Sequence, residues 1–188
     1  MRLLFFAGST REGSFNRKLA ALAHHIASAN GVEAVLVDLK DYPMPLYNGD
    51  LEAKEGPPER ARAFKALLAE YQGVFIASPE YNSSVTPLLK NTLDWVSRVK
   101  DDQIDVFRSR VFAISGASPG YYGAMRSLLH LRQILEIGLG ASVIPHQIAV
   151  PRAMDAFEGD GSLKDKAQQT LCKNVVEALA VAARKFMS

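Results

Sequence analysis

A short polar stretch directly after the first apolar run contains the residues best suited to hold an anion. The apolar sequence LLFFA is followed by GSTREGSFN at residues 8–16, and a helical pattern begins there. Ser9, Ser14 and Asn16 offer short polar side chains beside the free N–H groups of a helix start. Arg11 adds a planar cation that can bind two phosphate oxygens at once. Because the helix dipole also favours negative charge at this point, the stretch predicts a phosphate site.

Some alternative roles for residues 8–16 remain open, and others are excluded by the sequence. Ser14 or Asn16 would also serve as an ordinary helix cap. The segment is not G-x-G-x-x-G and lacks a Gly-Lys-Ser/Thr ending, so neither a Rossmann dinucleotide fingerprint nor an ATP-binding P-loop is predicted. Nucleophilic attack by cysteine is excluded, because the only cysteine, Cys172, lies far along the chain in a helical pattern. We therefore expect a phosphate to be held here and not cleaved.

Two further segments have the composition of a site for a flat ring. The first follows a buried apolar run and consists of Pro79, Glu80, Tyr81 and Asn82. Tyr81 offers an aromatic face to a planar ligand, although the tetrapeptide in isolation also fits a simple turn. Ser115 and Gly116 open a second segment that is small and rich in glycine, so its backbone can approach a ligand closely. A phosphate site, an aromatic face and a glycine-rich segment together fit flavin mononucleotide (FMN).

These segments follow apolar runs that alternate with helical patterns along the chain. Strands are expected near residues 2–7, 32–37, 73–78, 110–115 and 143–150, and helices lie between and after them. This alternation predicts an α/β fold with a parallel sheet covered on both faces. Ligands of such sheets bind beyond the carboxyl ends of the strands. The three segments follow strands one, three and four, so all three are expected at that edge.

The connecting regions carry more specific expectations. Residues 40–58 are rich in proline and glycine, which predicts a long irregular loop with a functional or interface role. A charged connection is expected over 100–108, and Pro145 interrupts the fifth strand. Ser162 is expected to cap the final helix, which would extend to residue 186.

Composition limits the class of protein. The chain has 188 residues, 48% of them hydrophobic and 22% charged, which predicts one globular domain over 1–188. A net charge of +2 without a basic stripe argues against a nucleic-acid partner. No apolar run is long enough for a bilayer, and Met1-Arg2 opens onto a strand, so neither a membrane span nor a signal peptide is expected. A single cysteine fits the reducing cytoplasm, and the scattered histidines predict no metal site.

The motifs resemble those of the NADPH-dependent FMN reductases, a family that includes bacterial chromate, quinone and azo-dye reductases. The matching segments are GSTREGSFN at 8–16, PEYN at 79–82, LKN at 89–91, DW at 94–95 and SGASPGYYG at 115–123. The resemblance covers about residues 3–150. It implies a flavodoxin-like, doubly wound sheet of five parallel strands in the order 2-1-3-4-5, with helices on both faces. One departure is Ala124 after Gly123, where the family often has two glycines.

The resemblance also implies a reaction and its site. NADPH or NADH would pass a hydride to bound FMN, and the electrons would then reach a quinone, an azo compound, a metal oxyanion such as chromate, ferric ion, or free flavin. No protein acid or base is required, because the flavin carries the chemistry. The FMN phosphate would lie among Ser9, Arg11, Ser14, Phe15 and Asn16. The flavin ring would lie among Pro79, Glu80, Tyr81 and Asn82, with Ser115 and Gly116 near its other edge.

Assembly and the competing functions stay open at this point. The family implies a homodimer or homotetramer with the flavin near the interface, and Arg126 and residues 40–58 are candidates for contacts across it. Glu80 is expected to have a structural or interface role and not to act as a general base. A flavodoxin-type electron carrier is an alternative, although the balanced charge argues against a carrier with an acidic docking face. A flavin-binding regulator without turnover is a further alternative.

Overall fold

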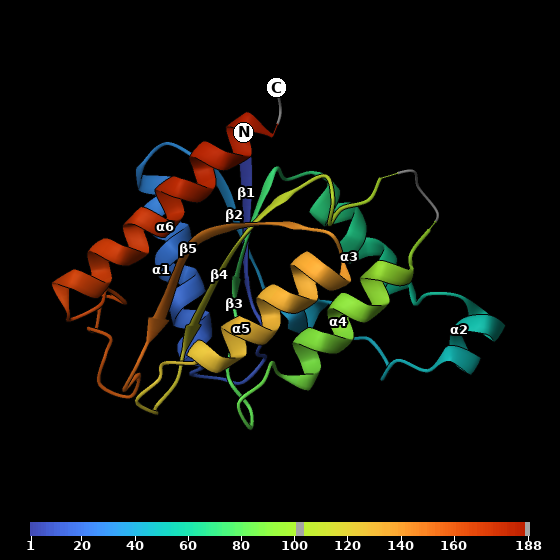
Figure 1. The fold of residues 1–188 in the computed structure, drawn as a ribbon, viewed down its shortest axis with the longest axis horizontal. Helices are drawn as coiled ribbons and strands as arrows, with labels where there is room; N and C mark the ends of the chain where they lie inside the picture. The colour runs from blue at the N-terminus through green and yellow to red at the C-terminus, as the bar shows by residue number, and fades with distance from the viewer. Residues whose placement is uncertain (101–103, 187–188) are drawn as a thin grey trace.

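The central element of the computed structural model is a five-stranded sheet (Figure 1), and the structure describes residues 1–100 and 104–186. The strands are β1 (Arg2–Ala7), β2 (Glu33–Val37), β3 (Gly73–Ala77), β4 (Val111–Ala117) and β5 (Ser142–Val150). Their order is β2-β1-β3-β4-β5, and all neighbours are parallel. This confirms the expected α/β fold and its strand order. Residues 101–103 of the predicted charged connection lie outside the described residues, as do 187–188.

Helices cover both faces of the sheet, as expected. The helices are α1 (Phe15–Ala29), α2 (Gly49–Glu55), α3 (Glu59–Ala69), α4 (Pro87–Arg98), α5 (Met125–Gln133) and α6 (Lys166–Lys185). Two shorter segments are a 3₁₀ turn, η1 (Leu39–Asp41), and a π-helical turn, η2 (Ile134–Gly138), which continues α5. Helices α1 and α6 cover one face, and α3, α4 and α5 cover the other (Figure 1).

The first strand shows why its sequence is a continuous apolar run. Leu3 and Phe5 pack with α1 and α6, whereas Leu4 and Phe6 pack with α3, α4 and α5. All four side chains are buried, because successive residues of a strand point to opposite faces and both faces are covered. The sheet therefore holds two cores, one on each side, and fixes the strand ends from both.

Residues 40–58 differ from the predicted irregular loop, because they contain helix α2. The Asn48 side chain accepts hydrogen bonds from the N–H groups of Asp50 and Leu51, and Gly56 ends the helix with φ 75°. None of the α2 residues is buried, and the helix projects away from the sheet beyond α4 (Figure 1). A short polar helix without a buried face leaves only a weak sequence pattern.

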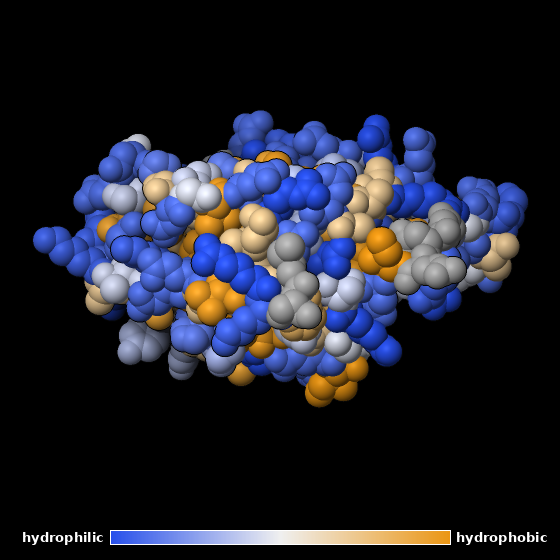
Figure 2. All heavy atoms as spheres, turned by 90° about the horizontal axis from the view of Figure 1, so that it is seen from above, coloured by the Kyte–Doolittle hydropathy of each residue, from blue (hydrophilic) through white to orange (hydrophobic). Residues whose placement is uncertain are grey.

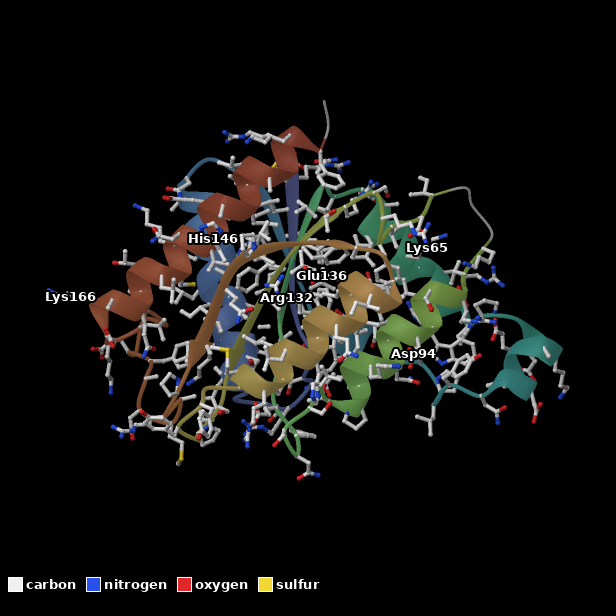
Figure 3. The ribbon with its side chains drawn as sticks, in the orientation of Figure 1. Lys65, Asp94, Arg132, Glu136, His146 and Lys166 are labelled. Carbon is white, nitrogen blue, oxygen red and sulfur yellow. The ribbon has the colours of Figure 1, made fainter. Side chains whose placement is uncertain are left out.

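The fifth strand runs from Ser142 to Val150 without a break, so Pro145 does not interrupt it as expected but coincides with a shift in its pairing. Its register with β4 shifts where Ala113 faces the segment 144–146. The Arg132 guanidinium stabilises this bulge by donating to the carbonyl oxygen of Ile144 at 3.0 Å. Arg132 also pairs with Glu136 of the π-helical turn at 2.9 Å (Figure 3).

The prediction that Ser162 caps the final helix is wrong. Asp165 caps α6, and its carboxylate accepts from the N–H groups of Ala167 and Gln168. Ser162 instead donates its hydroxyl and its N–H to the Asp160 carboxylate, at 2.7 and 2.9 Å. Within the residues that the structure describes, no helix is both long and apolar enough to cross a membrane.

Candidate functional site

The register of the sheet brings the three predicted segments together. Ala7 of β1 lies opposite Ala77 of β3, and Ala77 lies opposite Ser115 of β4. The loops that follow these strands therefore begin side by side, at the lower edge of the sheet in Figure 1. We call them the first loop (8–14), the second loop (78–86) and the third loop (118–124). The opposite end of the molecule, seen from above in Figure 2, is mostly hydrophilic with scattered hydrophobic residues.

The first loop presents buried hydroxyl groups at the start of α1. Ser14 is the helix cap, and its Oγ accepts from the N–H of Arg17 at 3.4 Å. Ser9 Oγ accepts from the N–H of Arg11 at 3.3 Å. Both serines are buried, and within the described residues neither hydroxyl donates to a protein acceptor. Their O–H protons are therefore available to an anion, in addition to the first N–H groups of α1.

Arg11 and Phe15 flank this group of donors. The Arg11 side chain is exposed, and its guanidinium carbon lies 5.6 Å from the centroid of the Phe15 ring. This contact orients a cation beside the buried hydroxyls without neutralising its charge. The first loop thus combines a cation, two hydroxyls and a helix start, which is the set that phosphate binding requires.

The Asn16 side chain has a different role from the predicted direct contact with phosphate. Its amide nitrogen donates to the carbonyl oxygen of Ala117 at 2.8 Å, and its amide oxygen accepts from the Ala117 N–H at 2.9 Å. The side chain is buried. Asn16 therefore joins the start of α1 to the end of β4, and only its backbone N–H remains available to the predicted phosphate site.

The second loop is a tight hairpin that exposes an aromatic ring. Tyr81 and Ser84 exchange two backbone hydrogen bonds of 3.0 Å, and the residues between them, Asn82 and Ser83, have φ values of 50° and 66°. Two central residues of positive φ are typical of a type I′ turn, in which asparagine is favoured. The Tyr81 side chain is 54% exposed, so its ring is available to a ligand. Pro79 is buried at the base of the hairpin.

Glu80 fixes the base of the second loop to α5. Its carboxylate forms an ion pair with Arg126 and accepts from the Ser127 N–H at 3.1 Å. The Glu80 side chain is only 6% exposed. Glu80 therefore has the expected structural role, and its partners belong to the same chain. Arg126 pairs with Glu80 and lies 5.2 Å from the Tyr122 ring centroid, and its contact across a subunit interface stays a prediction.

Replacing Glu80 by alanine is expected to lower the free energy of unfolding by about 1–2 kcal/mol, because Arg126 loses its partner and the Ser127 N–H loses its acceptor. Urea denaturation followed by circular dichroism measures this change. Glu136→Ala is the matched control, since it removes a carboxylate that pairs with Arg132 on the exposed face of the same helical segment. An equal loss in the two variants would show that Glu80 has no special role.

The third loop begins at Ser118, later in the sequence than the predicted start at Ser115. Ser115 and Gly116 belong to β4, and the Ser115 Oγ donates to the carbonyl oxygen of Ile76 at 3.2 Å. A Cβ atom at Gly116 would lie 2.8 Å from the Ala124 Cβ and 2.9 Å from the Ser78 carbonyl oxygen. Both residues therefore pack the strand ends against their neighbours. The first partly exposed residue at this edge is Ser118.

Ala124, which stands where the family often has a second glycine, is the residue directly before α5. Ala124 has φ 74°, and Gly123 before it has φ 59°. The left-handed region costs an alanine about 1–2 kcal/mol relative to glycine, so the family's second glycine would remove strain here. Gly123 cannot be replaced, because a Cβ atom would lie 2.6 Å from the backbone nitrogen of Pro151.

Sequence analysis missed several residues that hold the loops in place. Thr86 donates to the Gly8 carbonyl oxygen at 2.7 Å and so joins the second loop to the first. Ser127 donates to the Pro79 carbonyl oxygen at 2.9 Å. Thr86 precedes a proline at a helix start, which is a visible signal for a cap. The position of Ser127 within α5 carries no such signal.

The parallel sheet and the loops at its carboxyl edge define a flavodoxin-like nucleotide-binding fold. Residues 1–155 match the family model described as NADPH-dependent FMN reductase. The chain belongs to this family. The match confirms the resemblance, and with it FMN as cofactor, NAD(P)H as co-substrate and oxidoreductase activity.

Individual relatives agree with this assignment. An NAD(P)H-dependent FMN reductase of Pseudomonas aeruginosa is 33% identical over 187 residues, which are 99% of this chain and 97% of the relative. A quinone reductase of Escherichia coli K12 is 36% identical over 135 residues, which are 72% of this chain and 69% of the relative. Among solved structures, the NAD(P)H:acceptor oxidoreductase FerB of Paracoccus denitrificans superposes with a TM-score of 0.82 at 25% identity, covering 98% of both chains.

The geometry fits the cofactor that the family uses. The unused hydroxyls of Ser9 and Ser14, with Arg11 beside them, match a phosphate. The exposed ring of Tyr81 lies on the neighbouring loop at the same edge. No thiol chemistry competes, because burial raises the pKa of Cys172 to about 12.

Proposed function

We propose that this chain is a quinone reductase in which the first loop binds the FMN phosphate and the second and third loops enclose the flavin ring. The observation that carries the proposal is the meeting of the three loops at one sheet edge, with phosphate donors on the first and an exposed aromatic ring on the second. Relatives from Escherichia coli and Solanum tuberosum bear the names quinone reductase and NAD(P)H:quinone oxidoreductase. Quinones are therefore the first acceptor class to test.

In this proposal the protein residues bind and orient, and none transfers a proton. Ser9 and Ser14 donate hydroxyl hydrogen bonds to the phosphate, and Arg11 supplies the opposite charge. Phe15 supports Arg11, and Asn16 contributes its backbone N–H while its side chain holds the end of β4. FMN supplies the redox chemistry when bound, taking a hydride from NAD(P)H and giving electrons to the acceptor.

The ring site is formed by backbone and exposed side chains together. Tyr81 and Asn82 face the ligand from the hairpin, and Pro79 and Glu80 set its base. Ser115 and Gly116 bring the ends of β3 and β4 together, so that the third loop can approach the ring's other edge. A turn fixed by two hydrogen bonds keeps this surface in place before the ligand arrives.

The proposal also includes the oligomeric state of the protein and the cellular compartment in which it works. We expect a homodimer or homotetramer of single-domain chains spanning 1–188. Exposed hydrophobic residues support such contacts, namely Leu129, Ile137 and Leu46. Buried Cys172 as a free thiol suits the reducing cytoplasm.

Catalytic turnover is expected with both a nucleotide and an acceptor. The purified protein should carry releasable yellow FMN that is bleached anaerobically by NADPH or NADH within seconds, and added benzoquinone should restore the colour. Chromate, an azo dye, ferric citrate and free FMN in parallel reactions test the other acceptors. A flavin that neither nucleotide bleaches would contradict the proposed activity and would favour an electron carrier. Bleaching without reoxidation by quinone would contradict the quinone assignment alone.

A further inference from the structure

A groove of about 370 Å³ lies between α1 and β2, next to the first loop. Gly13 and Ser14 of the first loop form one end of it, so it is continuous with the proposed phosphate site. Arg17, Lys18, Ala20 and Ala21 of α1 line it on one side, and Leu36, Val37 and Asp38 line it on the other. We call this feature the α1–β2 groove.

The floor of the α1–β2 groove is apolar and open to solvent. Ala20 and Ala21 of α1 have small side chains, and they leave space above the edge strand β2. Leu36 of β2 is 43% exposed, which is unusual for a leucine in a covered sheet. A flat apolar surface between a helix and a strand suits one face of an aromatic base.

An ion pair stands at the β2 end of the groove. The Arg17 Nη2 atom lies 2.6 Å from the Asp38 Oδ2 atom, and the two side chains are 38% and 25% exposed. The other Asp38 oxygen accepts from the Lys40 N–H at 3.0 Å. Arg17 and Asp38 therefore both reach solvent and both lie within reach of a ligand in the groove.

These features match the adenosine end of a nicotinamide nucleotide. A carboxylate accepts hydrogen bonds from ribose hydroxyls. Asp38 follows β2 at the same edge of the sheet as the first loop, because Val37 lies opposite Phe6 of β1. A guanidinium binds a 2′-phosphate, whereas a carboxylate repels it. Arg17 and Asp38 thus favour opposite substituents at the same ribose position.

We propose that the α1–β2 groove binds the adenosine end of NAD(P)H and that the Arg17–Asp38 pair selects between NADPH and NADH. The inference rests on the proposed function in one respect, since it assumes that a nicotinamide nucleotide bound at the flavin extends past the first loop. Arg17 turns to the 2′-phosphate of NADPH, and Asp38 accepts from the 2′-hydroxyl of NADH.

A purely structural role for the pair makes a different prediction. If Arg17 and Asp38 only join α1 to β2, Arg17→Gln and Asp38→Asn break the same ion pair and change nucleotide binding in the same direction. If they contact the ribose, the two variants change selectivity in opposite directions. Asp38→Asn keeps an acceptor for the Lys40 N–H, so it is the milder change for the fold.

Binding of adenosine 2′,5′-bisphosphate to the FMN-saturated protein, measured by isothermal titration calorimetry, tests the inference without any turnover. Saturation with FMN keeps the probe out of the first loop. Arg17→Gln is expected to weaken binding about tenfold, because a charge-assisted contact with phosphate is lost. Asp38→Asn is expected to strengthen it, and 5′-AMP, which lacks the 2′-phosphate, should respond to Arg17→Gln less than twofold.

The matched control is Lys173→Gln. It removes the same charge from α6, outside the α1–β2 groove, where the Lys173 ammonium pairs with Glu177 at 3.7 Å. In steady-state assays the ratio of kcat/KM for NADPH to that for NADH should fall in Arg17→Gln and rise in Asp38→Asn. Equal shifts in both variants, or an Arg17→Gln effect no larger than that of Lys173→Gln, would overturn the inference. Failure of quinones to accept electrons would contradict the proposed function and leave the binding result intact.

Discussion

Replacing Asn16 by leucine is expected to lower the free energy of unfolding by about 2–4 kcal/mol, because the buried N–H and C=O of Ala117 each lose a partner. Leucine has the same number of side-chain heavy atoms in the same branched arrangement, so the substitution leaves no cavity and removes the hydrogen bonds. The two bonds join positions 101 residues apart in the sequence. Urea denaturation of the wild type and the variant, without flavin, measures the difference.

Asn91→Leu provides the control for Asn16→Leu. The Asn91 amide also pairs with backbone, donating to the Pro45 carbonyl oxygen at 2.9 Å and accepting from the Tyr47 N–H at 2.8 Å. That arrangement is exposed, so water can replace the lost partners and the cost should be clearly smaller. Equal losses in the two variants would show that burial of the Asn16 amide adds nothing.

Arg11→Ala is expected to raise the Kd for FMN by about tenfold to a hundredfold, which corresponds to the loss of a charge-assisted hydrogen bond to phosphate. Quenching of flavin fluorescence on binding measures the affinity. The effect should shrink as salt increases, because the Arg11 side chain is exposed and its charge is screened. Hydride transfer in the flavin-saturated variant should change much less than the affinity does.

Riboflavin is the control ligand for this prediction, since it has the same ring and lacks the phosphate. Its affinity should be the same in wild type and Arg11→Ala. Arg11→Lys keeps the positive charge but loses the planar guanidinium that can donate two parallel hydrogen bonds. Its Kd for FMN should therefore lie between the values of the wild type and Arg11→Ala. An unchanged Kd for FMN in Arg11→Ala would remove Arg11 from the phosphate site, and an equal loss of riboflavin binding would indicate a general disturbance of the first loop.

The fold was predictable because each strand has an apolar run that must be covered on both sides. Leu3 to Phe6 alternate between two cores, and a continuous apolar segment of that length fits a central strand of a parallel sheet. Thr86 and Pro87 begin α4 as capping rules predict. Those rules failed for the final helix because Ser162 and Asp165 are both good caps, and the nearby Asp160 engages Ser162.

The candidate site was predictable in residue types and less so in contacts. Local sequence identifies Ser14 as a helix cap and Gly8 as the end of a strand. It cannot show that the Asn16 amide is used by Ala117, or that Arg126 is held by Glu80, because these partners become neighbours only when the sheet forms. The α1–β2 groove was invisible for the same reason, since Arg17 and Asp38 meet only across two elements.

The bulge at Pro145 has a consequence for how copies of this chain can associate. β5 is the last strand of the sheet, and a last strand ordinarily offers unpaired N–H and C=O groups to another chain. Pro145 has no N–H to offer, and the shifted register around it bends the strand away from a regular ladder. Misassembly by strand addition is therefore opposed on the β5 side of the sheet, whereas β2, at the other edge, keeps a regular register with its neighbour.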